Sequence, residues 1–66
     1  MANFNAHLKE KVKETANKQG NTITLTRHLA EKNYSVIERT PQGKIHFSKM
    51  GICYSDAQET FDERLK

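Results

Sequence analysis

The chain has 66 residues, a net charge of +3 and one cysteine, Cys53. A chain of this length buries only about 60% of the surface that it exposes when unfolded, so we expect one small domain, residues 1–66, with a thin core and no enzyme-sized cavity. A single cysteine excludes an internal disulfide and fits a reducing compartment, and no apolar run approaches the roughly 20 residues of a membrane span, so we expect a cytoplasmic, bacterial protein.

The first expected element is a helix that begins at Asn3 or Asn5, either of which can cap it, and ends near Gln19. Its apolar residues recur at every fourth position and would line one stripe of a helix: Phe4, Leu8, Val12 and Ala16. Gly20 is well placed to end this helix in the left-handed conformation. We interpret the lysines of this segment as a solvated face rather than a binding site.

The next segment, residues 21–26, has two interpretations. Ile and Leu alternate with Thr, which is typical of a short strand. A threonine could instead cap a second helix that carries Leu25 and Leu29 inward. The spacing of these leucines and the helix-forming run 28–32 favour the helix. Asn33 would then end it, because Asn tolerates the left-handed conformation.

Residues 34–39 and 44–48 are expected to form a β-hairpin. Pro41 fixes φ at the first corner of a type I turn, and Gly43 supplies the positive φ that closes the turn with a bulge. A lone hairpin is marginally stable in water, so it must pack against the helices.

The alternation of side chains predicts the buried face of this hairpin. Tyr34 and Val36 share one face of the first strand, and Ile45 and Phe47 share one face of the second. Ile37 has the opposite parity, so it could mark a second buried face or a contact with a partner.

The last element is expected to be a helix that runs to the C-terminus, after an irregular or short extended link at residues 49–54. Residues 55–58 have the S-x-x-Q form of a capping box, and Asp56 is well placed against the helix dipole. The residues that point inward are Ala57, Phe61 and Leu65. The predicted fold class is α+β, with two N-terminal helices, a β-hairpin and a C-terminal helix.

Catalytic and metal-binding patterns are absent from the sequence. The three histidines fall in three different expected elements, without H-x-E or C-x-x-C spacing, whereas a zinc site needs about four ligands. Cys53 has no basic partner set beside it by the sequence, and there is no Gly-rich phosphate loop. We therefore expect no metal, no cofactor and no enzymatic activity.

The distribution of charge is the main functional indication. Residues 1–54 hold nine Lys and Arg against four Asp and Glu, whereas the last helix is acidic. Cations on a helix followed by a basic hairpin can neutralise nucleic-acid phosphates. The predicted contact residues are Arg27, His28, Lys32, Arg39, Lys44, His46 and Lys49. The alternative interpretation is a solubilising surface around a two-stranded sheet.

Residues 25–65 also resemble a segment that follows the nuclease domain in plasmid and transposon mobilisation relaxases. That segment has a helix, a short hairpin and a final helix that ends near an arginine. The residues that carry the resemblance are Leu25, Leu29, Asn33, Tyr34, Val36, Gly43, Ile45, Phe47, Met50, Gly51, Tyr54, Ser55, Phe61, Arg64 and Leu65.

The departures from this pattern limit what the resemblance implies. Asn33 stands where the family has glycine, the loop before Met50 is shorter, and Lys49 alone remains of its basic residues. The histidine cluster of the relaxase active site is missing from the sequence, so nicking activity does not transfer. The resemblance implies an accessory DNA-processing module of a mobile element such as a plasmid, transposon or phage.

Charge and resemblance together predict a non-catalytic nucleic-acid-binding module, with DNA as the expected partner. The alternative is a small inhibitor or regulator that binds a host protein through Ile37 and the acidic C-terminal helix. A homodimer is also plausible for so small a core, because association would bury more apolar surface.

Overall fold

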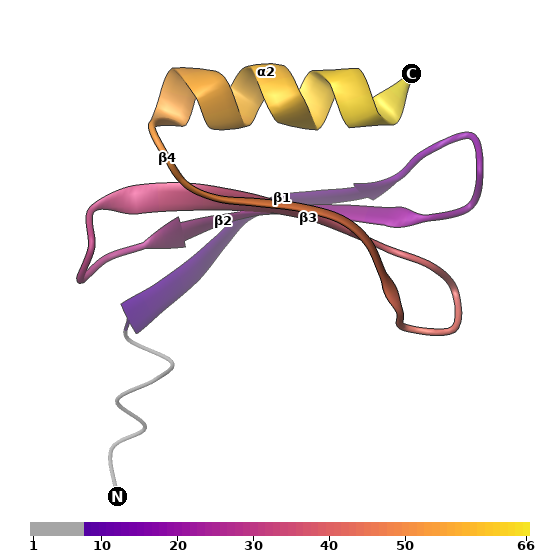
Figure 1. The fold of residues 1–66 in the computed structure, drawn as a ribbon, viewed down its shortest axis with the longest axis horizontal. Helices are drawn as coiled ribbons and strands as arrows, with labels where there is room; N and C mark the ends of the chain where they lie inside the picture. The colour runs from indigo at the N-terminus through magenta and orange to yellow at the C-terminus, as the bar shows by residue number, and fades with distance from the viewer. Residues whose placement is uncertain (1–7) are drawn as a thin grey trace, which may run out of the picture.

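The computed structural model describes residues 8–66, which form two layers, a four-stranded sheet and a helix (Figure 1). The strands are β1 (Lys9–Ala16), β2 (Thr22–His28), β3 (Asn33–Arg39) and β4 (Ile45–Ile52), and the helix is α2 (Tyr54–Leu65). Each strand pairs antiparallel with the next one in the chain, in the order β1-β2-β3-β4. The hairpin turn and the last helix lie where the sequence predicted them, although β4 continues to Ile52 through residues that were expected to form a link. The two expected N-terminal helices are wrong.

The first correction concerns the helix expected up to Gln19. Its proposed caps and Phe4 lie outside the described residues, and residues 9–16 form β1 instead. Val12 is 40% exposed and Leu8 is 43% exposed, so neither belongs to the core. The pattern was misleading because a regular strand, like a helix, places residues four apart on one face; in β1 a bulge at Val12 interrupts even this alternation.

The second correction concerns the helix expected to carry Leu25 and Leu29. Residues 22–28 form β2, in which Ile23 and Leu25 are fully buried while Leu29 lies past the strand and is 39% exposed. The alternation of Ile and Leu with Thr was therefore the decisive signal. The left-handed residue before β3 is Lys32, with φ of 58°, and Asn33 is already the first residue of the strand.

The turns β1–β2 and β3–β4 have the same hydrogen-bond pattern. In the first, the Gly20 N–H donates to the Asn17 carbonyl at 3.0 Å, and the Asn17 N–H donates to the Asn21 carbonyl at 2.8 Å. In the second, the Gly43 N–H donates to the Thr40 carbonyl and the Thr40 N–H donates to the Lys44 carbonyl, both at 2.8 Å. Both glycines have positive φ, 84° and 89°, which closes a three-residue hairpin loop. Gly20 thus has the predicted left-handed conformation, but in a hairpin.

Bulges in β4 change which of its residues face the helix. Phe47 pairs with Glu38 and packs against the core, whereas Ile45 pairs with Arg39 on the other face and is 58% exposed. The expected common face of Ile45 and Phe47 is therefore wrong. The register shift between these two pairs inserts one residue, which reverses the alternation.

The core lies between α2 and one face of the sheet. It consists of Ile23, Leu25, Val36, Ala57 and Phe61, with Tyr34, Phe47, Ile52 and Leu65 packed against it. The predicted inward stripe of α2 is confirmed. The capping box is not, because the helix begins at Tyr54 with Cys53 as its N-cap and no side-chain cap hydrogen bond. Asp56 lies in the first turn as expected.

Glu38 differs from its apolar neighbours in this layer because it carries a carboxylate and its side chain is nevertheless fully buried. Its carboxylate accepts hydrogen bonds from Asn21 Nδ2 at 2.7 Å and Asn17 Nδ2 at 3.0 Å, and from Arg64 Nε at 2.9 Å. Burial acts to raise the pKa of Glu38, but these hydrogen bonds outweigh it and hold the pKa below its ordinary value. The network joins the first turn, β3 and α2.

Candidate nucleic-acid interface

The seven predicted contact residues lie at different places on the sheet. One group surrounds the turn between β2 and β3, here called the β2–β3 end, and consists of Arg27, His28 and Lys32. A second group lies by the β3–β4 turn and consists of Arg39, Lys44 and His46. Lys49 lies between them in β4, opposite Val36. Because a seven-residue strand spans roughly 20 Å, the two groups form separate surfaces.

The β2–β3 end holds a hollow of about 280 Å³, here called the cationic hollow. Arg27, Leu29, Lys32 and Tyr34 line it. Arg27 pairs with Tyr34 across β2 and β3, so both point to the helix side of the sheet, and Lys32 approaches from the turn. The ring of Tyr34 meets that of Tyr54 edge-on, with 5.2 Å between centroids and 62° between planes. The hollow thus combines two cations with an aromatic wall.

The Arg27 guanidinium remains accessible to a ligand. Its Nη1 is 3.8 Å from Glu10 Oε1, and the two side chains are 53% and 60% exposed. An exposed pair at this distance contributes little free energy, so a phosphate can compete with Glu10. Leu29, which also lines this hollow, donates its backbone N–H to the Leu8 carbonyl at 2.9 Å.

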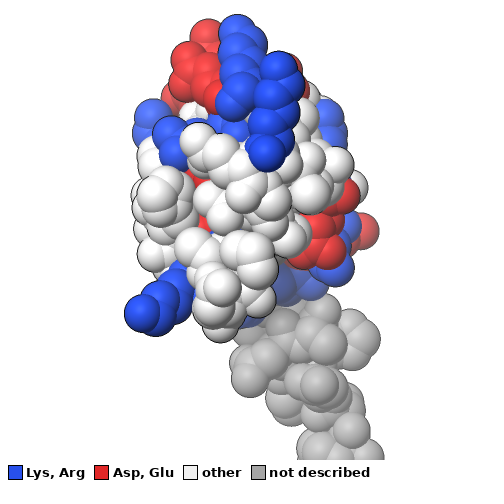
Figure 2. Space-filling view, turned by 90° about the vertical axis from the view of Figure 1, so that its right-hand side faces the viewer, with Lys and Arg blue, Asp and Glu red and all other residues white. Residues whose placement is uncertain are grey.

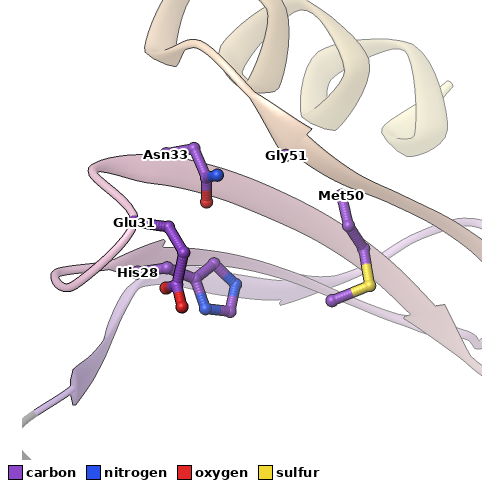
Figure 3. A pocket seen from close by; sticks show the side chains of 5 residues that line it. All are labelled: His28, Glu31, Asn33, Met50 and Gly51. Carbon is purple, nitrogen blue, oxygen red and sulfur yellow. The ribbon is translucent and has the colours of Figure 1, made fainter.

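A second hollow, of about 260 Å³, lies at the same end on the face of the sheet that points away from α2 (Figure 3). We call this face the far face and the cavity the far-face hollow. Its lining residues are His28, Glu31, Asn33, Met50 and Gly51. The His28 ring is held by a hydrogen bond of 2.8 Å between its Nε2 and the Ser35 hydroxyl, which is itself buried.

The opposite end of the molecule has a mixed charge. Figure 2, which views this end, shows Lys and Arg side by side with Asp and Glu around the C-terminal end of α2. Arg64 is engaged there by Glu38, and its guanidinium carbon also lies 4.3 Å from the centre of the Phe47 ring. A phosphate backbone would meet carboxylates as well as cations at this end.

The two parts of the surface expected for a protein partner, Ile37 and the C-terminal helix, lie on opposite faces of the sheet. Ile37 pairs with Thr24 and Ser48 on the far face, whereas α2 covers the other face. The two elements of that alternative therefore cannot contribute to one flat interface.

Candidate metal ligands are not brought together within residues 8–66. That part of the chain contains no cluster of three His, Cys, Asp or Glu residues that could hold a metal ion. Ser35 contacts His28 but is 1% exposed, so its hydroxyl is closed to a substrate. Residues 8–66 also contain no helix long and apolar enough to cross a membrane.

Sequence reasoning missed Leu29, Glu31, Asn33, Tyr34 and Met50 as lining residues of the two hollows. Each was interpreted as part of a helix, a cap, a core face or a link. The turn that gathers them exists only because residues 22–28 form a strand, and the alternation of Ile and Leu with Thr was the signal that could have found it.

Comparisons with models of protein families, with curated proteins and with solved structures found no match to this chain. The helix that the relaxase resemblance implied ahead of the hairpin is strand β2. The resemblance therefore stays a prediction that rests on the quoted residues alone.

Proposed function

We propose that this protein is a non-catalytic nucleic-acid-binding module whose main contact surface is the β2–β3 end. One observation carries the proposal: Arg27 and Lys32, from a strand and from the following turn, line the same hollow beside an aromatic ring. Arginine binds a phosphate in a bidentate manner, lysine adds a point charge, and a tyrosine ring offers a surface on which a sugar or base can rest.

The remaining predicted cations have a secondary role in this proposal. Lys44 at the other end of the sheet and Lys49 in β4 contribute a diffuse positive field that attracts a polyanion without positioning it, and His46 beside Lys44 offers a hydrogen-bonding group there. Arg39 lies on the far face, 12 residues after Arg27 in the sequence but at the opposite end of the strand pair.

The resemblance to relaxase segments is what favours DNA as the ligand and a mobile genetic element as the setting. We propose on the same ground that the protein acts as an accessory module rather than a nuclease. The single cysteine, which is exposed, fits the reducing cytoplasm of a bacterium, and we propose this compartment.

Salt-dependent fluorescence anisotropy with labelled single-stranded and duplex DNA tests the proposal. Two double variants form a matched pair, because each removes two positive charges: Arg27→Ala with Lys32→Ala, and Arg39→Ala with Lys44→Ala. If the β2–β3 end makes the phosphate contacts, the first double variant should lower the slope of log K against log salt by about 1.4 on single strands or about 1.8 on duplex. The second should change the slope much less.

A larger loss of salt slope in the second double variant than in the first would overturn the β2–β3 end as the main contact surface. It would place that surface at the β3–β4 turn instead. An absence of wild-type binding to either DNA at about 50 mM salt would overturn nucleic-acid binding itself. Circular dichroism of all proteins confirms that the compared variants are folded.

A further inference from the structure

The far-face hollow has a different chemistry from the cationic hollow. Its polar groups are the Glu31 carboxylate and the Asn33 amide, and its apolar surfaces are the imidazole of His28 and the thioether of Met50. Figure 3 shows the His28, Glu31 and Met50 side chains on the side of the sheet away from α2. A carboxylate in the wall disfavours a phosphate here.

The two polar groups are available to a ligand. Within residues 8–66, no side-chain hydrogen bond or ion pair involves Glu31 or Asn33. The neighbouring His28 ring, by contrast, is oriented by Ser35. The hollow therefore combines an oriented flat wall with unused hydrogen-bonding groups.

Gly51 borders this space in β4 without a side chain of its own. A Cβ at this position would lie 3.9 Å from Asn33 Nδ2, so the glycine backbone leaves the Asn33 amide accessible from the hollow. A planar ring can enter beside this amide, with the imidazole and the thioether against its faces.

We infer that the far-face hollow binds an unpaired guanine base, an inference that rests on the proposed nucleic-acid function. Guanine presents two adjacent donors, N1–H and the N2 amino group, which match the two oxygens of the Glu31 carboxylate, and its O6 can accept from the Asn33 amide. Adenine and cytosine each place a ring acceptor beside their amino donor, which would face the carboxylate, and thymine has a single donor.

This recognition uses the edge of guanine that pairs with cytosine in a duplex. The base must therefore be unpaired, so the hollow selects single-stranded DNA or RNA over a duplex. Consecutive residues serve the two hollows: Arg27 and Lys32 line the cationic hollow, while His28 and Asn33 line the far-face hollow. The phosphate and base contacts thus surround one turn.

The experiment measures anisotropy with labelled oligothymidine strands that carry one central G, A or C. Wild type should prefer the G strand by about 5-fold or more, the discrimination expected of a bidentate base contact. Glu31→Gln should reduce this preference by about 5-fold, because the guanine contact is lost, while the removal of one negative charge should strengthen binding to the strands that carry A, C or T alone. Glu59→Gln is the matched control, because it makes the same charge change on the exposed surface of α2 and should keep the preference.

A second measurement separates failure of this inference from failure of the proposed function. Guanosine monophosphate added to ¹⁵N-labelled protein should shift the Asn33 side-chain amide resonances, and adenosine monophosphate should not. Strand binding with equal affinity for all bases would overturn the guanine site and leave the proposed function standing. If the protein binds no strand but guanosine monophosphate shifts the Asn33 resonances, the ligand of the hollow is a free nucleotide. If guanosine monophosphate causes no shifts, the guanine site is overturned.

Discussion

Glu38 couples the sheet to the helix through a buried charge. Its two carboxylate oxygens receive three hydrogen bonds, from two asparagines of the first turn and from Arg64 of α2. Within residues 8–66, every buried side-chain nitrogen and oxygen has a hydrogen-bond partner. Since the network is fully satisfied, a change at Glu38 leaves the buried Asn21 amide without this carboxylate partner and weakens the contact to Arg64.

Glu38→Gln should therefore destabilise the protein by about 2 to 3 kcal/mol, measured by urea unfolding at neutral pH. The estimate is at the low end for a broken buried pair because the Arg64 side chain is 33% exposed and can be solvated. The control is Glu59→Gln on the exposed side of α2, with an expected change within about 0.5 kcal/mol. Equal midpoints for the two variants would contradict a stabilising role for the network.

The same network should make the stability depend on pH. Because the folded pKa of Glu38 lies below its ordinary value of 4.5, its contribution is present above pH 4.5 and is lost as the pH falls through the folded pKa. Glu14 acts in the same direction, since hydrogen bonds from Thr24 and Lys11 lower its pKa. Unfolding free energies measured from pH 7 down to pH 3 should fall less steeply for Glu38→Gln than for wild type.

At the scale of the elements, two glycine-closed turns determine the register of the sheet. Each places its glycine at positive φ, and each first residue also accepts a hydrogen bond with its side chain. Asn17 Oδ1 accepts from the N–H of Asn21 at 3.0 Å, and Thr40 Oγ1 accepts from the N–H of Lys44 at 3.2 Å. The turn residues thus define where both hairpins reverse.

Gly20→Ala and Gly43→Ala should each cost about 1 kcal/mol, because an L-residue resists the left-handed conformation. Neither glycine has an atom within 4 Å of an added Cβ, so the backbone alone causes the loss. Thermal unfolding followed by circular dichroism measures it. Gln42→Ala, in the same turn and exposed, should be nearly neutral. Unchanged melting temperatures in both glycine variants would contradict this account.

Strand β1 shows how an edge strand can have a helix-like composition. Its sequence KEKVKETA is rich in strong helix formers, yet it pairs with β2 from Lys9 to Ala16 with one bulge at Val12. All of its charged side chains except Lys13, which lies over the Phe61 ring, are exposed, and lysines on an edge strand discourage pairing with other chains. Tertiary pairing therefore overrides the local helix propensity.

At the scale of the whole molecule, one core holds both layers. The sheet contributes Ile23, Leu25 and Val36, and the helix contributes Ala57 and Phe61. Neither layer buries these side chains without the other, so we expect a single cooperative unfolding transition.

Phe61→Ala should cost about 3 to 5 kcal/mol, which is most of the stability expected for a domain of this size. Helical and strand signals in circular dichroism should be lost together at one lowered urea midpoint. Tyr54→Ala, on the same helix but 48% exposed, should cost much less. A sheet that persists after the helix signal is lost would contradict a shared core.

Elements whose signals act between neighbouring residues are the ones that the sequence predicts. The β3–β4 turn and the stripe of α2 were predicted because Pro41, Gly43 and an i, i+4 repeat act through neighbouring residues. The N-terminal half was wrong because a spacing of four suits both kinds of element. Of the candidate interface, Arg27, His28 and Lys32 lie at one end of the sheet, but the sequence did not predict that Arg27 and His28 point to opposite faces or that Arg39 lies at the other end.

The sequence by itself determined the turns, the buried face of α2, the alternation of β2 and the excess of cations. Each follows from local conformational preference or from composition. The tertiary structure decided that residues 9–16 and 22–28 are strands, that Glu38 is buried, and that two hollows flank the β2–β3 turn. These features depend on pairing between distant segments, whose free energy exceeds the small helix propensity of any one segment.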